Sequence, residues 1–345
     1  MVARLENIEH STIIRSKNSN DVDPGLISIV IPTLYRPKGL ETAFRSAACQ
    51  NVTGFNIEII VADNSPDASA KNQANELFKN TDTKAKYISV PLPGVANVRN
   101  AALNVSEGQF IAFLDDDQEA TQNWLSSMMN QIDKDNSYAV FSRIEGRSAL
   151  PHKNFLPKLA FFSRRHDNKP SGLSKKFYGC GGSLINLSLI ASELMYFDPA
   201  RNQTGGEDDA FFSAIQQSGG FFSWSKEALV YEDVPPHRMS KRYICQRSFA
   251  FGQGPSRLCL ELDSYSISKL ITWMIIGAIQ MVVYAPLAVL TMPFENAMHM
   301  KYLRKCCEGA GKFFWQEVFR QKLYGQAAVE KIHRKRSKKL IKFKS

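Results

Sequence analysis

Cysteine is scarce in this chain. The 345 residues include six cysteines, which are scattered and show no paired spacing of the kind that metal sites use. A small secreted scaffold held by disulfides is therefore excluded, and we expect reduced, cytosolic thiols. The first 24 residues also lack an apolar run of signal-peptide length and carry four acidic residues, so the sequence does not predict export.

A glycine-rich turn is missing after the first expected strand, residues 27–31. A dinucleotide-dependent oxidoreductase needs Gly-x-Gly-x-x-Gly at this turn, but residues 32–36 read Pro-Thr-Leu-Tyr-Arg. That class is therefore unsupported. The glycine-rich basic loop of the nucleotidyltransferases that make sugar nucleotides is missing too. Such an enzyme would still share a parallel sheet and acidic metal ligands, so it stays an alternative.

Positive charge is confined to one end of the chain. The formal net charge is +10, but residues 331–345 hold eight Lys or Arg and no acid, which leaves about +2 for the rest. Such a tail binds anionic lipid or nucleic acid, or is simply solvated. Because it follows a long apolar stretch, we expect an anionic membrane surface as its partner and no nucleic acid.

Apolar residues are plentiful, at 44% of the chain, which is sufficient for one large core with an appendage. Short β-rich runs alternate with segments of helical spacing over the first 114 residues. The expected strands are 27–31, 57–62, 86–90 and 109–114, and the expected helices are 40–49, 70–78 and 95–105. This alternation predicts an α/β fold with a mostly parallel sheet flanked by helices.

Polar residues directly follow three of these strands. They are Thr33, Asp63 and the triplet Asp115–Asp117. Ligands of open α/β sheets bind beyond the carboxyl ends of the strands, so these residues are the first candidates for a site. Three adjacent carboxylates repel one another, and a divalent cation with a diphosphate compensates them. An acidic turn or helix N-terminus is the structural alternative.

A second acidic group follows a glycine pair. Residues 205–212 read Gly-Gly-Glu-Asp-Asp-Ala-Phe-Phe and lead into an apolar segment with helical spacing. A carboxylate held at the start of a helix is suited to act as a general base on an acceptor hydroxyl. Helix capping by Glu207 and Asp209 is the structural alternative here.

With both acidic groups in place, the sequence resembles glycosyltransferase family 2, whose members are inverting enzymes with the GT-A fold. The resemblance covers roughly residues 28–254. It rests on five motifs in order, which are Ser28–Thr33, Val61–Ser65, Gly94–Asn100, Asp115–Asp117 and Gly206–Asp208. The layout is most similar to bacterial transferases that build exopolysaccharide repeat units on lipid carriers, including the succinoglycan type.

The resemblance implies a set of residues that bind the nucleotide-sugar donor. They are Thr33 and Asp63 at the nucleobase, Arg99 and Asn100 near the base or the diphosphate, Asp116 at the ribose, and Asp115. The donor would be a nucleoside-diphosphate sugar, with UDP-sugars expected first.

The resemblance also implies metal ligands and catalytic residues. Asp117 would bind Mg²⁺ or Mn²⁺, and His237 is a candidate to complete the metal shell, although a surface-loop histidine explains His237 as well. Asp208 would deprotonate the attacking hydroxyl, and Glu207 would help to hold the acceptor. Processive members carry Gln-x-x-Arg-Trp, whereas residues 246–249 read Gln-Arg-Ser-Phe, which favours the addition of a single sugar to a saccharide acceptor.

The longest apolar stretch, residues 270–292, contains 23 residues and no formal charge. As a helix it would reach about 34 Å, which is enough to span a bilayer. A single span would place the basic tail outside, against the positive-inside rule, so a re-entrant or interfacial helical hairpin is favoured. A buried core helix is the remaining reading of this stretch. A non-enzymatic membrane-surface binding protein would explain the stretch and the tail, but not the two acidic groups.

These features predict four segments along the chain. They are a flexible N-terminal segment (1–25), a GT-A glycosyltransferase domain (26–255), a membrane-associated helical region (256–325) and a basic tail (326–345). We expect the protein at the cytoplasmic face of the inner membrane, acting on an acceptor that is linked to a polyprenyl lipid.

Overall fold

The computed structural model describes residues 22–148, 156–164, 169–261, 266–294, 296–322 and 324–344. The chain forms two compact units. Unit 1 comprises Met1–Ile144, Arg164–Glu232 and Leu323–Ser345, and unit 2 comprises Glu145–Ser163 and Asp233–Lys322. The expected boundary after residue 255 falls inside a helix of unit 2. Most of the expected flexible segment lies outside the described residues, and its end already belongs to the first strand.

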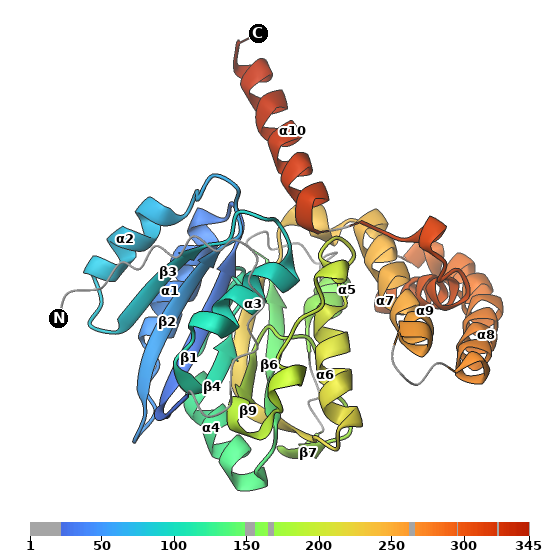
Figure 1. Cartoon of the computed structure of the whole chain (residues 1–345). Coiled ribbons are helices and arrows are strands. Elements are labelled where there is room, and N and C mark those ends of the chain that lie inside the picture. The colour runs from blue at the N-terminus through green and yellow to red at the C-terminus, as the bar shows by residue number, and fades with distance from the viewer. Residues whose placement is uncertain are drawn as a thin grey trace. The chain divides into compact units, whose positions relative to one another are not determined.

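The first half of unit 1 has the predicted alternation of strands and helices (Figure 1). The strands are β1 (Asp23–Thr33), β2 (Asn56–Asp63), β3 (Lys84–Ser89) and β4 (Gly108–Phe113), and the helices between them are α1 (Pro37–Ala48), α2 (Lys71–Lys79) and α3 (Val95–Val105). The strands pair in parallel in the order β3-β2-β1-β4. Because these runs are buried on both faces, they read as nearly continuous apolar sequence.

The second half of the sheet is antiparallel, so the expectation of a mostly parallel sheet holds only for four strands. β8 (Ser183–Asn186) pairs antiparallel with both β4 and β6 (Ala139–Arg147). β9 (Phe222–Asp233) pairs antiparallel with β5 (Gln118–Ala120) and with β7 (Gly172–Ser174). Strand-helix-strand crossovers, which keep neighbouring strands parallel, are replaced here by irregular connections.

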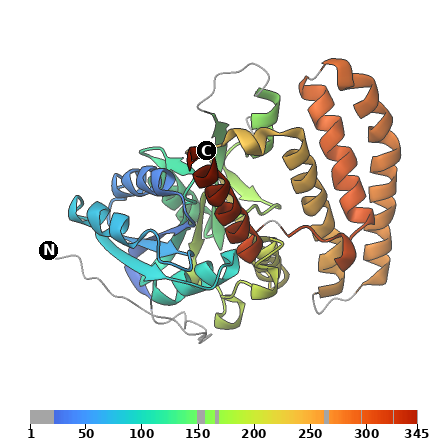
Figure 2. The same ribbon diagram turned by 90° about the horizontal axis from the view of Figure 1, so that it is seen from above.

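Helices cover both faces of the sheet in unit 1 (Figure 2). Alternate residues of β1 face opposite sides, so Ile29 packs with α1, α2 and α4 (Trp124–Asp135), whereas Val30 packs with α3 and α6 (Glu207–Gln217). Short 3₁₀ helices precede α6, which are η3 (Leu187–Leu189), η4 (Ser192–Leu194) and η5 (Pro199–Arg201). The last helix, α10 (Gly325–Lys344), also belongs to unit 1. The result is the three-layer arrangement expected for an α/β fold.

Unit 2 is helical. Its long helices are α7 (Lys241–Glu261), α8 (Ile267–Thr291) and α9 (Ala297–Phe313), and α9 packs along both of the others. The shorter elements are α5 (Leu156–Leu159), η2 (Ala160–Phe162), η6 (Pro236–Met239), η7 (Met292–Phe294) and η8 (Glu317–Phe319). Gly277 of α8 and Gly309 of α9 lie so close that a Cβ on Gly277 would come within 2.6 Å of the Gly309 carbonyl oxygen.

The expected apolar stretch 270–292 lies in α8 and η7. Within the described residues, Ile267–Phe294 is long and apolar enough to cross a membrane, by length and composition alone. Only 11% of its most apolar part is buried inside the protein. Because a core helix would be mostly buried, the reading of α8 as a core helix is not supported.

Candidate functional site

The turn after β1 binds the aspartate triplet that follows β4. The two strands are parallel neighbours with Val30 opposite Phe113, so the residues beyond their ends meet. Thr33 Oγ1 donates a hydrogen bond to Asp116 Oδ2 at 2.9 Å, and the Leu34 amide donates to the same oxygen at 3.2 Å. Asp116 is only 5% exposed, so these donors compensate the desolvation of its charge.

Arg36 joins the same group of carboxylates. Its Nη1 donates to Asp116 Oδ1 at 2.7 Å and to Asp117 Oδ2 at 2.8 Å. The turn that presents it contains Tyr35 at φ +56°, a left-handed conformation that is uncommon for a residue other than glycine. Pro37 then begins α1 directly after Arg36. Arg36 was not among the predicted site residues.

Gly39, in the first turn of α1, lies against the backbone of Asp116. A Cβ at this position would come within 2.0 Å of the Asp116 carbonyl oxygen, so a side chain there would push the helix away from the triplet. The absence of a side chain at residue 39 therefore lets α1 fix the distance between Arg36 and the aspartates.

The second acidic group stands at the start of α6. Gly205 (φ +79°) and Gly206 (φ +86°) turn the chain in a way that L side chains rarely allow, and α6 begins at Glu207. Asp208 Oδ1 accepts a hydrogen bond from the Asp209 amide at 2.9 Å. Asp208 therefore stands in the first turn of α6, a position that favours acidic side chains because the N-terminal end of a helix carries partial positive charge.

Arg99 of α3 connects the two acidic groups. Its Nη1 lies 2.5 Å from Glu207 Oε1, and its Nη2 lies 4.0 Å from Asp115 Oδ1. The guanidinium is buried beside the rings of Phe113 and Phe197, at 5.8 Å and 5.6 Å from their centroids. The triplet after β4 and the start of α6 therefore face the same buried cation, although they are almost a hundred residues apart in the sequence.

The segment between β7 and β8 lies beside both acidic groups. A Cβ on Gly179 would come within 2.8 Å of Asp208 Oδ2, and one on Gly181 within 2.6 Å of Asp115 Oδ2. Arg164 donates hydrogen bonds to the carbonyl oxygens of Gly179 at 3.2 Å and Gly181 at 2.9 Å. Two positions without side chains thus leave room for the carboxylates, and Arg164 holds this segment in place.

Two carboxyl groups of the site, Asp115 and Glu207, have raised pKa values. Desolvation raises the pKa of Asp115 to about 6; Arg99 opposes the rise, and the charges of Asp117 and Asp116 add to it. The Asp115 side chain nevertheless stays 35% exposed, which leaves it open to a ligand. Burial, followed by the charge of Asp208, raises the pKa of Glu207, while Arg99 lowers it. The site therefore concentrates negative charge in a place with little water.

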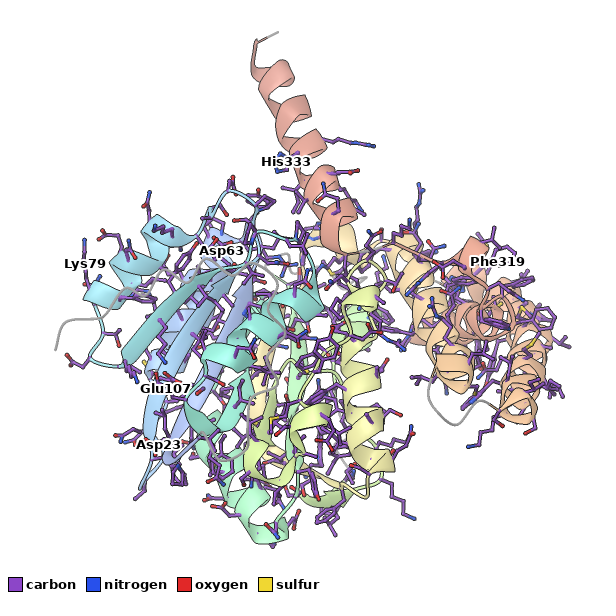
Figure 3. The ribbon with its side chains drawn as sticks, in the orientation of Figure 1. Asp23, Asp63, Lys79, Glu107, Phe319 and His333 are labelled. Carbon is purple, nitrogen blue, oxygen red and sulfur yellow. The ribbon has the colours of Figure 1, made fainter. Side chains whose placement is uncertain are left out.

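Asp63, which we predict at the nucleobase, is fully buried at the end of β2 (Figure 3). Its Oδ1 accepts from the Ser65 amide at 2.9 Å, and its Oδ2 accepts from the Ala70 amide at 2.8 Å and from the Tyr87 hydroxyl at 2.9 Å. The carboxylate thus shapes the loop after β2. A direct contact with a base would have to replace one of these hydrogen bonds.

Asn100, predicted near the base or the diphosphate, binds the backbone of Phe197 instead. Its Nδ2 donates to the Phe197 carbonyl at 2.7 Å, and its Oδ1 accepts from the Phe197 amide at 2.8 Å. Nearby, Asn202 Oδ1 accepts from the Ala96 amide at 2.9 Å and so caps α3. These contacts tie α3, which carries Arg99, to the segment that leads into α6. A donor contact of Asn100 stays a prediction.

The residues at the triplet fit a divalent cation. Oxygen atoms of Asp116 and Asp117 converge on one nitrogen of Arg36, so they already share a single cationic position. Carboxylate oxygens are the ligands that Mg²⁺ and Mn²⁺ prefer, and one or two suffice when substrate phosphates supply the others. In the described part of the chain no group of three His, Cys, Asp or Glu side chains forms a protein-only metal site. His237 lies on η6 in unit 2, and its role as a ligand stays a prediction.

The C-terminal helix begins beside the loop that precedes α6. The Tyr324 amide donates to the Gln203 carbonyl at 3.0 Å. Further along α10, the His333 ring packs edge-on against Tyr35 with ring centroids 5.6 Å apart (Figure 3). α10 therefore contacts both loops that carry the site, the one before Arg36 and the one before Asp208.

Four contributors to the site were missed from the sequence, namely Arg36, Gly39, Arg164 and Asn202. Arg36 had a local signal, because it stands three residues after Thr33 in the same turn. The others act through packing between segments that are distant in the sequence, and no local pattern marks them.

Comparison with known proteins gives consistent matches. The glycosyl transferase family 2 profile matches residues 28–191. The succinoglycan biosynthesis protein ExoM of Rhizobium meliloti (strain 1021) is 30% identical over 241 residues, which cover 68% of this chain and 75% of that protein. The GalNAc(5)-diNAcBac-PP-undecaprenol β-1,3-glucosyltransferase of Campylobacter jejuni is 28% identical over 151 residues, which cover 44% of this chain and 46% of that protein.

Among solved structures, residues 1–349 of S. aureus TarS in complex with UDP are similar, with a TM-score of 0.49 and 16% sequence identity. The match covers 81% of this chain and 89% of that one.

Proposed function

Because the chain belongs to glycosyltransferase family 2 and has the GT-A fold of these enzymes, we propose that it transfers a single sugar from a UDP-sugar to a saccharide acceptor, with inversion at the anomeric carbon. The observation that carries this proposal is the convergence of the two acidic groups on Arg99. The motifs that carry the family resemblance include both acidic groups. In the fold, both groups lie near the buried guanidinium of Arg99. Family membership also argues against the alternative that the protein is a nucleotidyltransferase that makes sugar nucleotides.

Asp208 is the proposed general base. The acceptor hydroxyl oxygen forms a bond to the anomeric carbon while the bond from that carbon to the diphosphate oxygen breaks, and its electron pair leaves with the diphosphate. The hydroxyl proton passes to Asp208. A positioned base of this kind contributes about 10²- to 10⁴-fold to the rate. Glu207, fixed by Arg99, is proposed to orient the acceptor.

Asp116 and Asp117 are the proposed residues at the ribose and at a Mg²⁺ or Mn²⁺ ion, with His237 as a further candidate ligand. The bound ion would offset the negative charge that grows on the leaving diphosphate, which is worth several kcal/mol in metal-assisted reactions. Thr33 and the Leu34 amide keep the Asp116 carboxylate oriented in the meantime. Arg99, buried beside Asp115, supplies permanent positive charge to the same region.

The acceptor is proposed to be lipid-linked, and the reaction to occur at the cytoplasmic face of a membrane in polysaccharide synthesis. One of the relatives is named for an undecaprenol-linked substrate, and another for succinoglycan biosynthesis. Polyprenyl-linked sugars reside in membranes, so an enzyme that uses them must approach a lipid surface. Residues of unit 2 offer a suitable surface.

An exposed apolar stripe runs along α8. Its outward-facing residues recur every three or four positions and include Ile267, Ile271, Ile275, Ile279, Val282, Val283, Val289 and Leu290. The buried residues Leu270, Gly277 and Ala288 occupy the opposite side of the helix, where α9 packs. An apolar stripe of this size on a soluble protein marks a surface that binds a partner or a membrane.

The partner helix argues against a simple span. α9 carries Lys301, Arg304, Lys305 and Glu308, and Lys312 is buried beside α8 with its Nζ 3.1 Å from Gln280 Oε1. If α8 crossed the bilayer, α9 would bring these charges into the hydrocarbon, which is costly. We therefore place the α8 stripe in the interfacial layer, with both ends of the hairpin on the cytoplasmic side.

The catalytic proposal is tested by incubating the purified protein with individual UDP- and GDP-sugars, Mn²⁺ and soluble saccharide acceptors, and by detecting products by mass spectrometry. The expected result is one acceptor extended by one sugar, with release of the nucleoside diphosphate. Synthesis of a sugar nucleotide, or no transfer with any donor while the protein is folded, would contradict it.

The membrane proposal is tested by sedimentation with phosphatidylcholine-phosphatidylglycerol vesicles. Replacing Ile275 and Ile279 by Asp should lower vesicle binding by about 100-fold, since each buried isoleucine contributes about 1.5–3 kcal/mol. Leu173→Asp, which changes an exposed leucine of unit 1, is the matched control and should bind like the unchanged protein.

A protease experiment tests on which side of the membrane the basic tail lies. Protease added outside spheroplasts should leave the tail intact. Cleavage of the tail under these conditions would show that α8 spans the membrane.

A further inference from the structure

We propose that Arg36 is the resident counter-ion of Asp116 and Asp117, and that a divalent cation must displace it from this position before the site can work. This inference rests on the proposed function, because it concerns the cation that the donor diphosphate would bring. It makes Arg36 a positioning residue that sets when the aspartate pair is available.

The geometry shows a single shared cation position. One nitrogen atom, Arg36 Nη1, lies 2.7 Å from Asp116 Oδ1 and 2.8 Å from Asp117 Oδ2. Two carboxylate oxygens from successive residues thus point at one positive centre. A metal ion held by Asp117 would lie about 2.0–2.1 Å from its carboxylate oxygen, and Arg36 Nη1 already occupies the space beside Asp117 Oδ2 at 2.8 Å. The guanidinium and the ion therefore exclude each other.

Asp116 and Asp117 need a neighbouring positive charge whether or not a metal ion is bound. The side chains of Asp116 and Asp117 are 7% and 15% exposed, so water screens their repulsion poorly. Arg99 does not replace Arg36 in this role, because its ion contacts are with Glu207 and Asp115. Without a metal, Arg36 supplies the missing charge and keeps the pair from repelling.

The structure also allows Arg36 to leave. Its side chain is 39% exposed, so it has a path to solvent. Asp116 Oδ2 keeps its hydrogen bonds from Thr33 and Leu34 when Oδ1 loses Arg36, so the oriented carboxylate remains for an incoming ion. Only the guanidinium has to move. The backbone of residue 36 stays fixed by the start of α1, where the Leu40 amide donates to the Arg36 carbonyl at 2.9 Å.

The decisive experiment measures Mn²⁺ binding to the full chain without any sugar nucleotide, by the electron paramagnetic resonance signal of free Mn²⁺. Arg36→Gln should bind Mn²⁺ at least about tenfold more tightly than the unchanged protein, because a competing positive charge a few ångströms away has been removed. Arg36→Lys, which keeps the charge, should stay near the unchanged value. Adding Asp117→Asn to Arg36→Gln should abolish the gain.

Arg45→Gln is the matched control. Arg45 lies on α1, the helix that follows Arg36, and pairs with Glu41 on the surface, so its loss should leave Mn²⁺ binding unchanged. Equal affinities for Arg36→Gln and Arg45→Gln would overturn the proposal.

A second measurement on the unchanged protein covers the case in which Arg36→Gln does not fold. Phenylglyoxal modifies exposed guanidinium groups, and mass spectrometry locates the modified residue. Mn²⁺ alone should speed the modification of Arg36 and leave that of Arg45 unchanged; a rate for Arg36 that Mn²⁺ leaves unchanged or lowers would contradict displacement. Neither measurement uses sugar transfer, so failure here is distinguishable from failure of the proposed reaction.

Discussion

The two acidic groups of the site are neutralised in different ways. The triplet after β4 is held by Arg36, a partly exposed residue from the adjacent turn, whereas Glu207 at the start of α6 is held by Arg99, which is buried. An exposed counter-ion can be exchanged for another cation at small cost, but a buried one cannot. The comparison indicates that the triplet can accept a different cation, whereas the ion pair at the start of α6 stays in place. Three substitutions and one deletion test this difference.

Asp208→Asn should have the largest effect on the reaction. It leaves the donor side of the site intact but removes the proton acceptor, so kcat should fall by about 10²- to 10⁴-fold. The affinity for UDP, measured by isothermal titration calorimetry, should stay unchanged. Turnover like that of the unchanged protein would remove Asp208 from the role of base.

Arg99→Met should have the largest effect on stability. It leaves Glu207 buried without its partner, and the free energy of unfolding in urea should fall by about 3–5 kcal/mol. Arg147→Met, which breaks an exposed 2.6 Å pair with Asp233, is the control and should cost at most about 1 kcal/mol. Similar losses in both variants would show that Arg99 is not a fixed buried counter-ion.

Asp117→Asn should act on the donor rather than on the fold. Removing one carboxylate from the cation position should weaken Mn²⁺-dependent UDP binding on the order of 100-fold, since the ion contributes several kcal/mol. Calorimetry with Mn²⁺ and with EDTA separates the metal-dependent part of the binding free energy. Unchanged metal dependence would mean that the cation binds elsewhere.

Deletion of residues 335–345 should have the smallest effect on the site. It removes six of the eight basic residues of the tail but retains His333, which contacts Tyr35. Activity on a soluble acceptor should stay within about twofold, whereas binding to anionic vesicles should weaken at low salt and less so at high salt. Loss of UDP binding would show that the tail belongs to the donor site.

The first half of the fold was predictable because its signals are local. Apolar runs closed by Pro32, Asp63 and Asp115 mark buried parallel strands, and the helices between them follow from their spacing. The antiparallel half was not predicted, because strands such as β8 and β9 pair across irregular connections whose lengths carry no periodic signal. The membrane-type helix was predicted from length and charge alone, and its partner face became visible only in the packing with α9.

The candidate site was predictable in its carboxylates and in Arg99, but not in Arg36 and Arg164. Asp115–Asp117 and Glu207–Asp208 stand out because acids rarely end apolar strands or follow glycine pairs. In the structure Arg99 lies between Asp115 and Glu207, one residue from each group, and the shared function of the two groups stays a prediction. The positions of Arg36 and Arg164 depend on which segments pack together. Asp63 binds backbone amides of the loop after β2, and Asn100 binds the backbone of Phe197. No residue pattern distinguishes such structural contacts from contacts with a ligand.

The most direct test of the account is a crystal structure of Asp208→Asn with UDP and Mn²⁺, in which anomalous scattering locates the metal. The account predicts a manganese peak at Asp117, with Arg36 withdrawn from the aspartates and the diphosphate on the side of residue 208. A manganese peak or a nucleotide bound away from the region between Asp117 and residue 208 would contradict the single site on which the proposed reaction depends.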